Sequence, residues 1–168
     1  MSTGEETPTE FSTQRAREFP TIRQFTVFLE NRVGQLLEVV RRFEGSHVRI
    51  VALSINDAAE CAFVRFLLSH PDLGREILER AGLPIIESDL IGLELPDRPQ
   101  PLLQVCTALL QAEINIIQTY PVLVRPHGRP VVAVMVDNIE MALETLDSNG
   151  IRMISEEDLD FDNFSSSE

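Results

Sequence analysis

The chain has 168 residues, a mass of 18.9 kDa and a formal charge of −13, which is enough for one ordinary domain or two small ones. All 14 basic residues are arginine, which excludes Schiff-base chemistry and a phosphate-loop lysine. The acidic balance also argues against a nucleic-acid partner, because such binding relies on basic side chains that neutralise phosphates.

Much of the negative charge lies at the two ends of the chain. Residues 1–18 hold four acids and two arginines, and residues 156–168 hold six acids and no base. We expect a disordered N-terminal tail over residues 1–19 and an acidic disordered tail over residues 156–168.

Neither a membrane span nor a signal peptide is visible in the sequence, so we expect no membrane contact. Cys61 and Cys106 lie in apolar runs without metal-binding spacing. We therefore expect two buried thiols in a cytoplasmic protein.

The first half of the chain predicts the order strand, helix, strand, strand, helix, strand. One helix follows Gly34, and a second begins at Pro71 and ends before Gly82. The strands are expected at residues 24–29, 49–55, 61–69 and 83–87. The apolar stripe of the first helix, at helical spacing, is predicted to be Leu36, Leu37, Val40 and Phe43.

The second half predicts the same order again. Its strands are expected at residues 90–95, 114–124, 131–136 and 151–155, with a turn over residues 125–130. Its helices carry two apolar stripes, namely Leu102, Leu103, Cys106 and Leu109, then Ile139, Ala142, Leu143 and Leu146.

The two halves are copies of one unit. A shift of 66 residues aligns residues 28–54 with 94–120 at six identical positions, and a shift of 68 aligns residues 62–86 with 130–154 at five. We therefore predict an α+β protein of two ferredoxin-like βαββαβ units, residues 20–88 and 89–155. Each unit places its helices on one face of an antiparallel sheet.

The two copies are expected to pair side by side, sheet edge to sheet edge, because units of about 65 residues are marginal alone. Apolar residues fall on both faces of the strands, as Phe25 and Phe28 illustrate. We expect the helix-free sheet face to pack against a second chain, giving a homodimer.

Two functions common for this unit are excluded. Metal carriers of this shape need a CxxC motif in the first loop, which is missing here. RNA readers need exposed aromatic residues and basic charge, whereas this chain has no tryptophan and a single tyrosine, Tyr120.

The loop before the first helix, Glu30-Asn31-Arg32-Val33-Gly34-Gln35-Leu36, carries a family resemblance. It resembles the E-N-R-P-G-x-L loop of the serine-binding regulatory domain of phosphoglycerate dehydrogenase. That domain belongs to the ACT family of amino-acid-sensing regulatory modules. The family also has an asparagine at the second strand, 18 residues after the loop asparagine. Asn115, followed by Ile116, matches that position in the second copy.

The resemblance implies a binding site for a small free amino acid, shared between two ACT domains, in a regulatory protein without catalytic residues or cofactors. The residues that it assigns are Asn31, Val33, Gly34, Gln35, Leu36, Asn115 and Ile116. Backbone N–H groups at a helix start suit a carboxylate, and an asparagine amide can meet an ammonium group. Gly34 can equally serve a tight turn, and Asn31 a helix cap.

The corresponding second site would combine Asp97, Gln100 and Arg49. Gln100 replaces the glycine, Pro101 removes a backbone donor, and Asp97 with Arg49 can form a salt bridge. Our hypothesis is that the first site binds ligand and that the second is degenerate or structural.

Two other functions stay open. The protein can be a regulatory subunit of an amino-acid biosynthetic enzyme, as in the related acetolactate synthase regulatory subunit, acting mainly by protein contact. A glyoxalase-type metal enzyme is the remaining alternative, although the predicted strands offer few metal ligands. His47, His70 and His127 are dispersed and are expected to be surface residues.

Overall fold

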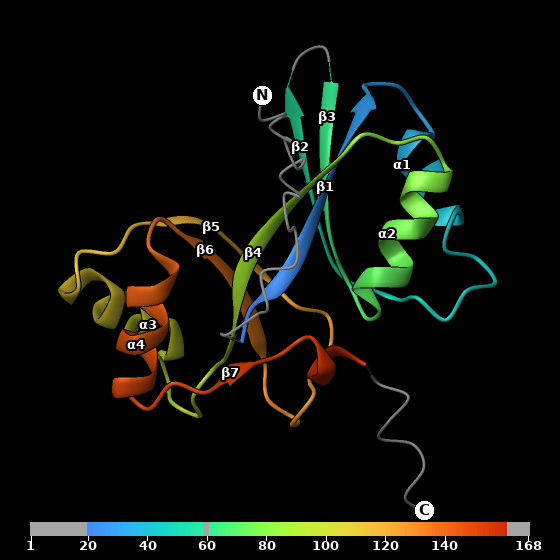
Figure 1. The fold of residues 1–168 in the computed structure, drawn as a ribbon. Helices are drawn as coiled ribbons and strands as arrows, with labels where there is room; N and C mark the ends of the chain where they lie inside the picture. Colours follow the sequence, from blue (N-terminus) through green and yellow to red (C-terminus); the bar gives the residue numbers. More distant parts are fainter. Residues whose placement is uncertain (1–19, 59–60, 161–168) are drawn as a thin grey trace, which may run out of the picture.

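The computed structural model describes residues 20–58 and 61–160 of the chain. The predicted N-terminal tail therefore lies outside the described residues. The predicted element order is present twice (Figure 1). The elements are β1 (Ile22–Glu30), α1 (Gln35–Arg41), β2 (Ile50–Ala58), β3 (Cys61–Leu68), α2 (Pro71–Arg80), β4 (Ile85–Glu94), α3 (Pro101–Gln111), β5 (Ile116–Pro121), β6 (Val131–Val136), α4 (Ile139–Ser148), β7 (Met153–Ile154) and the 3₁₀ turn η1 (Glu157–Leu159).

One antiparallel sheet of seven strands runs through both units, in the order β2-β3-β1-β4-β6-β5 with β7 beside β4. The first half of β4 pairs with β1, and its second half pairs with β6 and β7. The strands predicted at residues 83–87 and 90–95 are therefore one strand that serves both units. The fold is α+β, with two βαββαβ units joined in a single sheet, as predicted.

All four helices cover the same face of this sheet. Alternate residues of β4 show this, because Ile85 packs into the core beneath α1 and α2, whereas Ile91 and Leu93 pack into the core beneath α3 and α4. Leu90, of the opposite parity, points to the other face. Figure 1 shows the two helix pairs at opposite ends of the molecule, with the strands between them.

The other face of the sheet is concave and encloses a third core. The sheet curls until its edges approach, and the backbone N–H of Leu123, just after β5, donates to the carbonyl of Val51 in β2 at 2.7 Å. The enclosed side chains come from both units and include Ile22, Val51, Ala52, Leu67, Leu90, Tyr120, Val122, Val131, Ala133 and Ile154. Our prediction that a second chain covers this face is wrong for the enclosed region, because the two halves of one chain cover each other.

The helix α4 buries Ala142, Leu143 and Leu146, as predicted, whereas α1 and α3 bury stripes that differ from the predicted ones. The helix α1 ends at Arg41, and within it only Val39 is fully buried. In α3 the buried residues are Val105, Ala108 and Leu109, while Leu103 is 66% exposed and the Cys106 thiol is also exposed. Because α3 is apolar on most of its circumference, its periodicity does not define which side meets the sheet.

The folded part extends past the predicted boundary at residue 155. Residues 157–159 form η1, and Leu159 is completely buried in the concave core. The prediction of a disordered tail is therefore wrong for residues 156–160, and residues 161–168 lie outside the described residues.

Candidate ligand-binding site

The loop between β1 and α1 has the open backbone that the sequence suggested. Gly34 adopts φ +91°, and a Cβ placed there would meet nothing within 4 Å. Its carbonyl accepts the first helical hydrogen bond, from the N–H of Glu38, at 3.0 Å. A positive φ with open space on the Cα side allows a ligand to approach the backbone of this turn.

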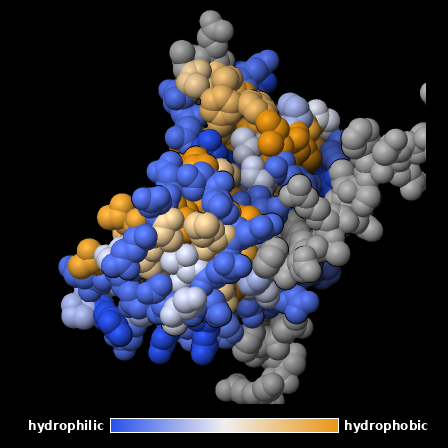
Figure 2. Space-filling view, turned by 60° about the vertical axis from the view of Figure 1, so that its left-hand side comes forward, coloured by the Kyte–Doolittle hydropathy of each residue, from blue (hydrophilic) through white to orange (hydrophobic). Residues whose placement is uncertain are grey.

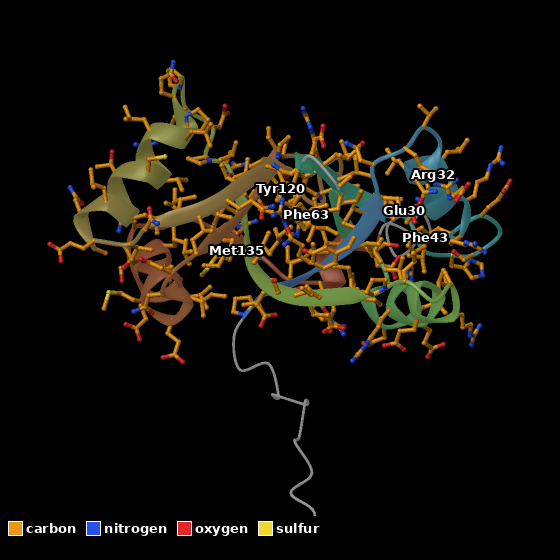
Figure 3. The ribbon with its side chains drawn as sticks, turned by 90° about the horizontal axis from the view of Figure 1, so that it is seen from above. Glu30, Arg32, Phe43, Phe63, Tyr120 and Met135 are labelled. Carbon is orange, nitrogen blue, oxygen red and sulfur yellow. The ribbon has the colours of Figure 1, made fainter. Side chains whose placement is uncertain are left out.

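The side chains of this loop point in different directions. The Asn31 amide donates to Asp57 Oδ1 in β2 at 2.8 Å, and Arg32 pairs with Glu30 on the surface. Val33 is fully exposed, whereas Leu36 packs against the core beneath α1. Figure 3 labels Glu30 and Arg32 at the α1 end of the molecule. Asn31 thus connects the loop to the β2–β3 hairpin and does not cap α1, which has no side-chain cap.

Asn115 and Ile116 lie in the other unit, at the start of β5. Asn115 forms two hydrogen bonds with Asp137: its N–H donates to the side-chain Oδ1 of Asp137 at 3.1 Å, and its carbonyl accepts from the backbone N–H of Asp137 at 3.2 Å. The helix α1 follows the loop that holds Asn31, and the helix α3 precedes Asn115. Figures 1 and 3 show these two helices at opposite ends of the molecule. The structure therefore does not bring Asn31 and Asn115 together within one chain.

The loop between β4 and α3, which holds Gln100, borders a cavity that the sequence did not indicate. Its volume is about 420 Å³, and it lies between the start of α3 and the end of α4. Its polar lining comes from Arg98, Gln100, Gln104, Thr107, Gln111 and Asn149. The Gln104 Oε1 atom is buried without a hydrogen-bond partner in the described part of the chain. Arg49 lies in the first unit, where its backbone N–H donates to the Ser69 hydroxyl at 2.9 Å.

Two of the three histidines have carboxylate partners, which the sequence analysis missed. His127 Nδ1 lies 2.8 Å from Glu94 Oε2, and the Glu94 side chain is only 3% exposed. His70 Nε2 lies 3.3 Å from Asp160 Oδ2. The partners are 33 and 90 residues away in sequence, so no local spacing could have revealed these pairs.

Arg23 is paired with two carboxylates from different parts of the chain. Its guanidinium contacts Glu156 at 2.9 Å and Asp72 at 2.6 Å. Burial alone would lower the pKa of Arg23, but the hydrogen bonds and charges of these two carboxylates offset this and raise it above its ordinary value.

Within the described residues, no three or more His, Cys, Asp or Glu side chains are grouped in a way that could hold a metal ion. The described helices include none with the length and apolar character required to cross a bilayer. Fold and loops together define a class, namely a double βαββαβ protein with an accessible glycine turn before a helix.

The family model of the ACT domain pair matches residues 20–161. The chain therefore belongs to the ACT domain pair family. No curated protein matches the sequence at a significant level.

Solved structures share the fold. Protein BT0572 from Bacteroides thetaiotaomicron is similar with a TM-score of 0.76 and 23% identity, over 84% of this chain and 97% of that one. The regulatory subunit of aspartate kinase from Thermus thermophilus follows with a TM-score of 0.54 and 12% identity, over 78% and 93%. Its counterpart from Thermus flavus has a TM-score of 0.51 and 12% identity, over 79% and 94%.

Proposed function

We propose that this protein is a non-catalytic regulator that binds a small free amino acid between two ACT domains and passes the bound state to a protein partner. The observation that carries the proposal is the Gly34 turn in the loop that resembles the family's binding loop. Its exposed backbone can receive a carboxylate, and Asn31 beside it offers an amide that donates and accepts.

The binding residues in this proposal are Asn31, Val33, Gly34, Gln35 and Leu36 from one ACT domain, with Asn115 and Ile116 from another. Because the two groups lie at opposite ends of one chain (Figures 1 and 3), the second group must come from another chain. A homodimer supplies it most simply, since each chain carries both halves of the site.

In this structure, the Asn31 amide N–H donates to Asp57 Oδ1 at 2.8 Å. A ligand ammonium group would be attracted to the Asp57 carboxylate and to the Asn31 amide oxygen together. Ligand binding therefore exchanges this contact between β1 and β2 for contacts with the ligand, which is how the bound state would reach the β2–β3 hairpin.

In the alternative function, the chain acts as a regulatory subunit of an amino-acid biosynthetic enzyme, mainly by protein contact. The exposed apolar side chains of α3, among them Leu103 at 66% and Leu110 at 75% exposure, favour such contact. Co-purification with a larger enzyme, without any amino-acid effect, would favour this alternative.

A thermal-shift screen against the free amino acids tests the main proposal. A ligand that binds only the folded state stabilises it by about 2.7 kcal/mol at a hundred times its dissociation constant. We expect one small amino acid to raise the melting temperature of the wild type and not that of Asn31→Ala.

Three further variants make the screen decisive. Asn56→Ala changes an exposed asparagine on the neighbouring strand and should keep the full ligand shift. A shift that survives Asn31→Ala and Asn115→Ala but disappears in Gln104→Ala would move the ligand to the cavity beside α3. No shift with any amino acid would contradict the proposal.

A further inference from the structure

The last segment that the structure describes, residues 155–160, contacts both units, and we name it the C-terminal clasp. Glu156 accepts hydrogen bonds from Arg23 of β1, from its backbone N–H and its Nε at 2.9 Å each and from its Nη2 at 3.1 Å. Leu159 is completely buried in the concave core, to which both units contribute. The clasp therefore covers the seam, by which we mean the place where the two halves of the curled sheet meet.

Asp158 connects the clasp to the loop between β5 and β6. Its Oδ2 accepts from the N–H of Ser155 at 2.8 Å and from the Ser155 hydroxyl at 3.2 Å, which closes the turn that begins η1. Its Oδ1 faces His127 Nε2 at 3.7 Å. Because Leu159 follows Asp158 directly, the contact with His127 acts on the turn that places Leu159 in the core.

His127 lies between two carboxylates. Its Nδ1 is 2.8 Å from the buried Glu94, and its Nε2 faces Asp158. A neutral imidazole can donate its one N–H to Glu94 but carries no charge that attracts Asp158, whereas an imidazolium donates to Glu94 and also attracts the Asp158 carboxylate. Arg129 and Arg152 also face Glu94, at 3.8 and 3.9 Å, and supply positive charge whether or not His127 carries a proton.

His70, which faces the far end of the clasp, differs from His127. Its Nδ1 is 2.9 Å from the Ser69 hydroxyl, and its Nε2 faces Asp160. The hydroxyl can donate to Nδ1 and leave the Nε2 proton for Asp160, so the neutral ring satisfies both contacts. His70 lines a cavity of about 450 Å³, together with the charged residues Arg23, Asp72, Glu156 and Glu157.

We propose that the C-terminal clasp is a pH-sensitive strap whose closure depends on the proton of His127. With the imidazolium, Glu94 accepts a hydrogen bond, Asp158 faces a positive charge and the clasp is closed. With the neutral ring, the Asp158 contact is lost, the turn that begins η1 loosens and the seam between the units opens more often. Protonation and closure favour each other by linkage. This device is independent of amino-acid binding.

Hydrogen–deuterium exchange of the full chain tests the proposal from about pH 5 to about pH 8, the range in which histidine changes charge. After correction for intrinsic exchange, we expect the protection of residues 155–160 to fall about two- to fivefold as the pH rises, the usual worth of an ion pair that is partly open to solvent. Protection in the centre of β1 and β4 should stay constant over the same range.

Three variants complete the experiment. His127→Gln should give low clasp protection without pH dependence, and His47→Gln, which changes an exposed histidine, should keep the wild-type profile. Asp158→Asn keeps Leu159 and should also lose the pH dependence, which decides the matter if His127→Gln destabilises the whole sheet. A flat wild-type profile, or a wild-type profile in both His127→Gln and Asp158→Asn, would overturn the proposal.

Discussion

At the residue scale, a small polar cluster inside the concave core joins the two units. Gln24 of β1 is 1% exposed, and its Oε1 accepts from the Tyr120 hydroxyl at 2.7 Å and from Gln118 Nε2 at 3.1 Å. The labels of Figure 3 place Tyr120 and Phe63, from different units, near the middle of the molecule. Because a buried polar group without partners is costly, this cluster fixes one register of the two sheet halves.

Tyr120 gives a direct test of this cluster. Burial raises its pKa, and the nearby charge of Arg65 offsets this only in part, so the folded-state value lies well above the ordinary one. Above about pH 10 the unfolded chain loses the phenol proton while the folded chain keeps it, so the free energy of unfolding should fall as the pH rises. Below that pH, both states are protonated and Tyr120 contributes no pH dependence.

The measurement is clean because Tyr120 is the only tyrosine of a chain without tryptophan. Phenolate absorbance should appear only as the protein unfolds, and Tyr120→Phe should remove the tyrosine-dependent part of the alkaline slope. At neutral pH the variant should lose about 1 kcal/mol, since Gln118 still satisfies Gln24. Phenolate formation at about pH 10 in the folded protein would contradict the burial argument.

At this scale, a feature can be predicted from the sequence only when the residues that form it are close together in the chain. The exposed turn at Gly34 was predictable, because glycine before an apolar helical stripe is a local signal. The pairs His127–Glu94 and Arg23–Glu156 were not, since only the fold joins residues 33 and 133 positions apart. Composition made the histidines look like surface residues, and only the fold places carboxylates beside them.

At the element scale, β4 carries the connection between the units. The sequence indicated two short strands because residues 83–87 and 90–95 each match the β pattern, with polar residues between them. Ser88 and Asp89 lie within the strand and pair with Gln24 and Arg23 of β1, so the interruption of the pattern is not an interruption of the backbone. Hydrophobic periodicity reports side-chain environment and does not show where a strand continues through a polar stretch.

Gly92 lies in β4 just past Leu90, where the pairing of β4 with β1 stops and its pairing with β7 starts. A Cβ at this position would collide with Ile22 Cδ1 and Ile154 Cγ1, both fully buried. Gly92→Ala should therefore lower the free energy of unfolding by about 1–3 kcal/mol through overpacking, measured by urea denaturation. Ile22→Val removes the first obstructing atom, so the double variant should be less destabilised than the sum of the single ones. Simple additivity would show that Ile22 is not what excludes the alanine.

At the scale of the whole molecule, the curled sheet explains why the chain has two kinds of interior. The helix-covered face was predictable from the repeat, whereas the concave core was not, because the sequence does not encode how far a sheet curls. Apolar residues on both strand faces indicated a covered second face, but the pattern is the same whether a second chain or the other unit covers it. Figure 2, which brings the α3 and α4 side forward, shows a mostly hydrophilic surface with scattered hydrophobic groups.

Leu159 closes one end of the concave core. Leu159→Ala should lower the free energy of unfolding by about 2–5 kcal/mol, the range for a leucine removed from a packed core. Leu123→Ala is the matched control, because Leu123 is 72% exposed and should change stability by less than about 0.5 kcal/mol. Equal effects of the two substitutions would show that the clasp does not contribute to the core in solution.

The separation of Asn31 and Asn115 makes the last prediction one about assembly. If each binding site takes Asn31 from one chain and Asn115 from another, Asn31→Ala and Asn115→Ala each destroy every site in their own homodimers. A heterodimer of the two variants contains one intact site, because the unaltered Asn31 of one chain meets the unaltered Asn115 of the other. After subunit exchange, random pairing should restore about a quarter of the wild-type binding capacity, measured by calorimetric titration with the amino acid found in the screen. The restored sites should have wild-type affinity. A mixture that stays inactive, although subunit exchange is demonstrated with labelled chains, would mean that the two asparagines do not share a ligand.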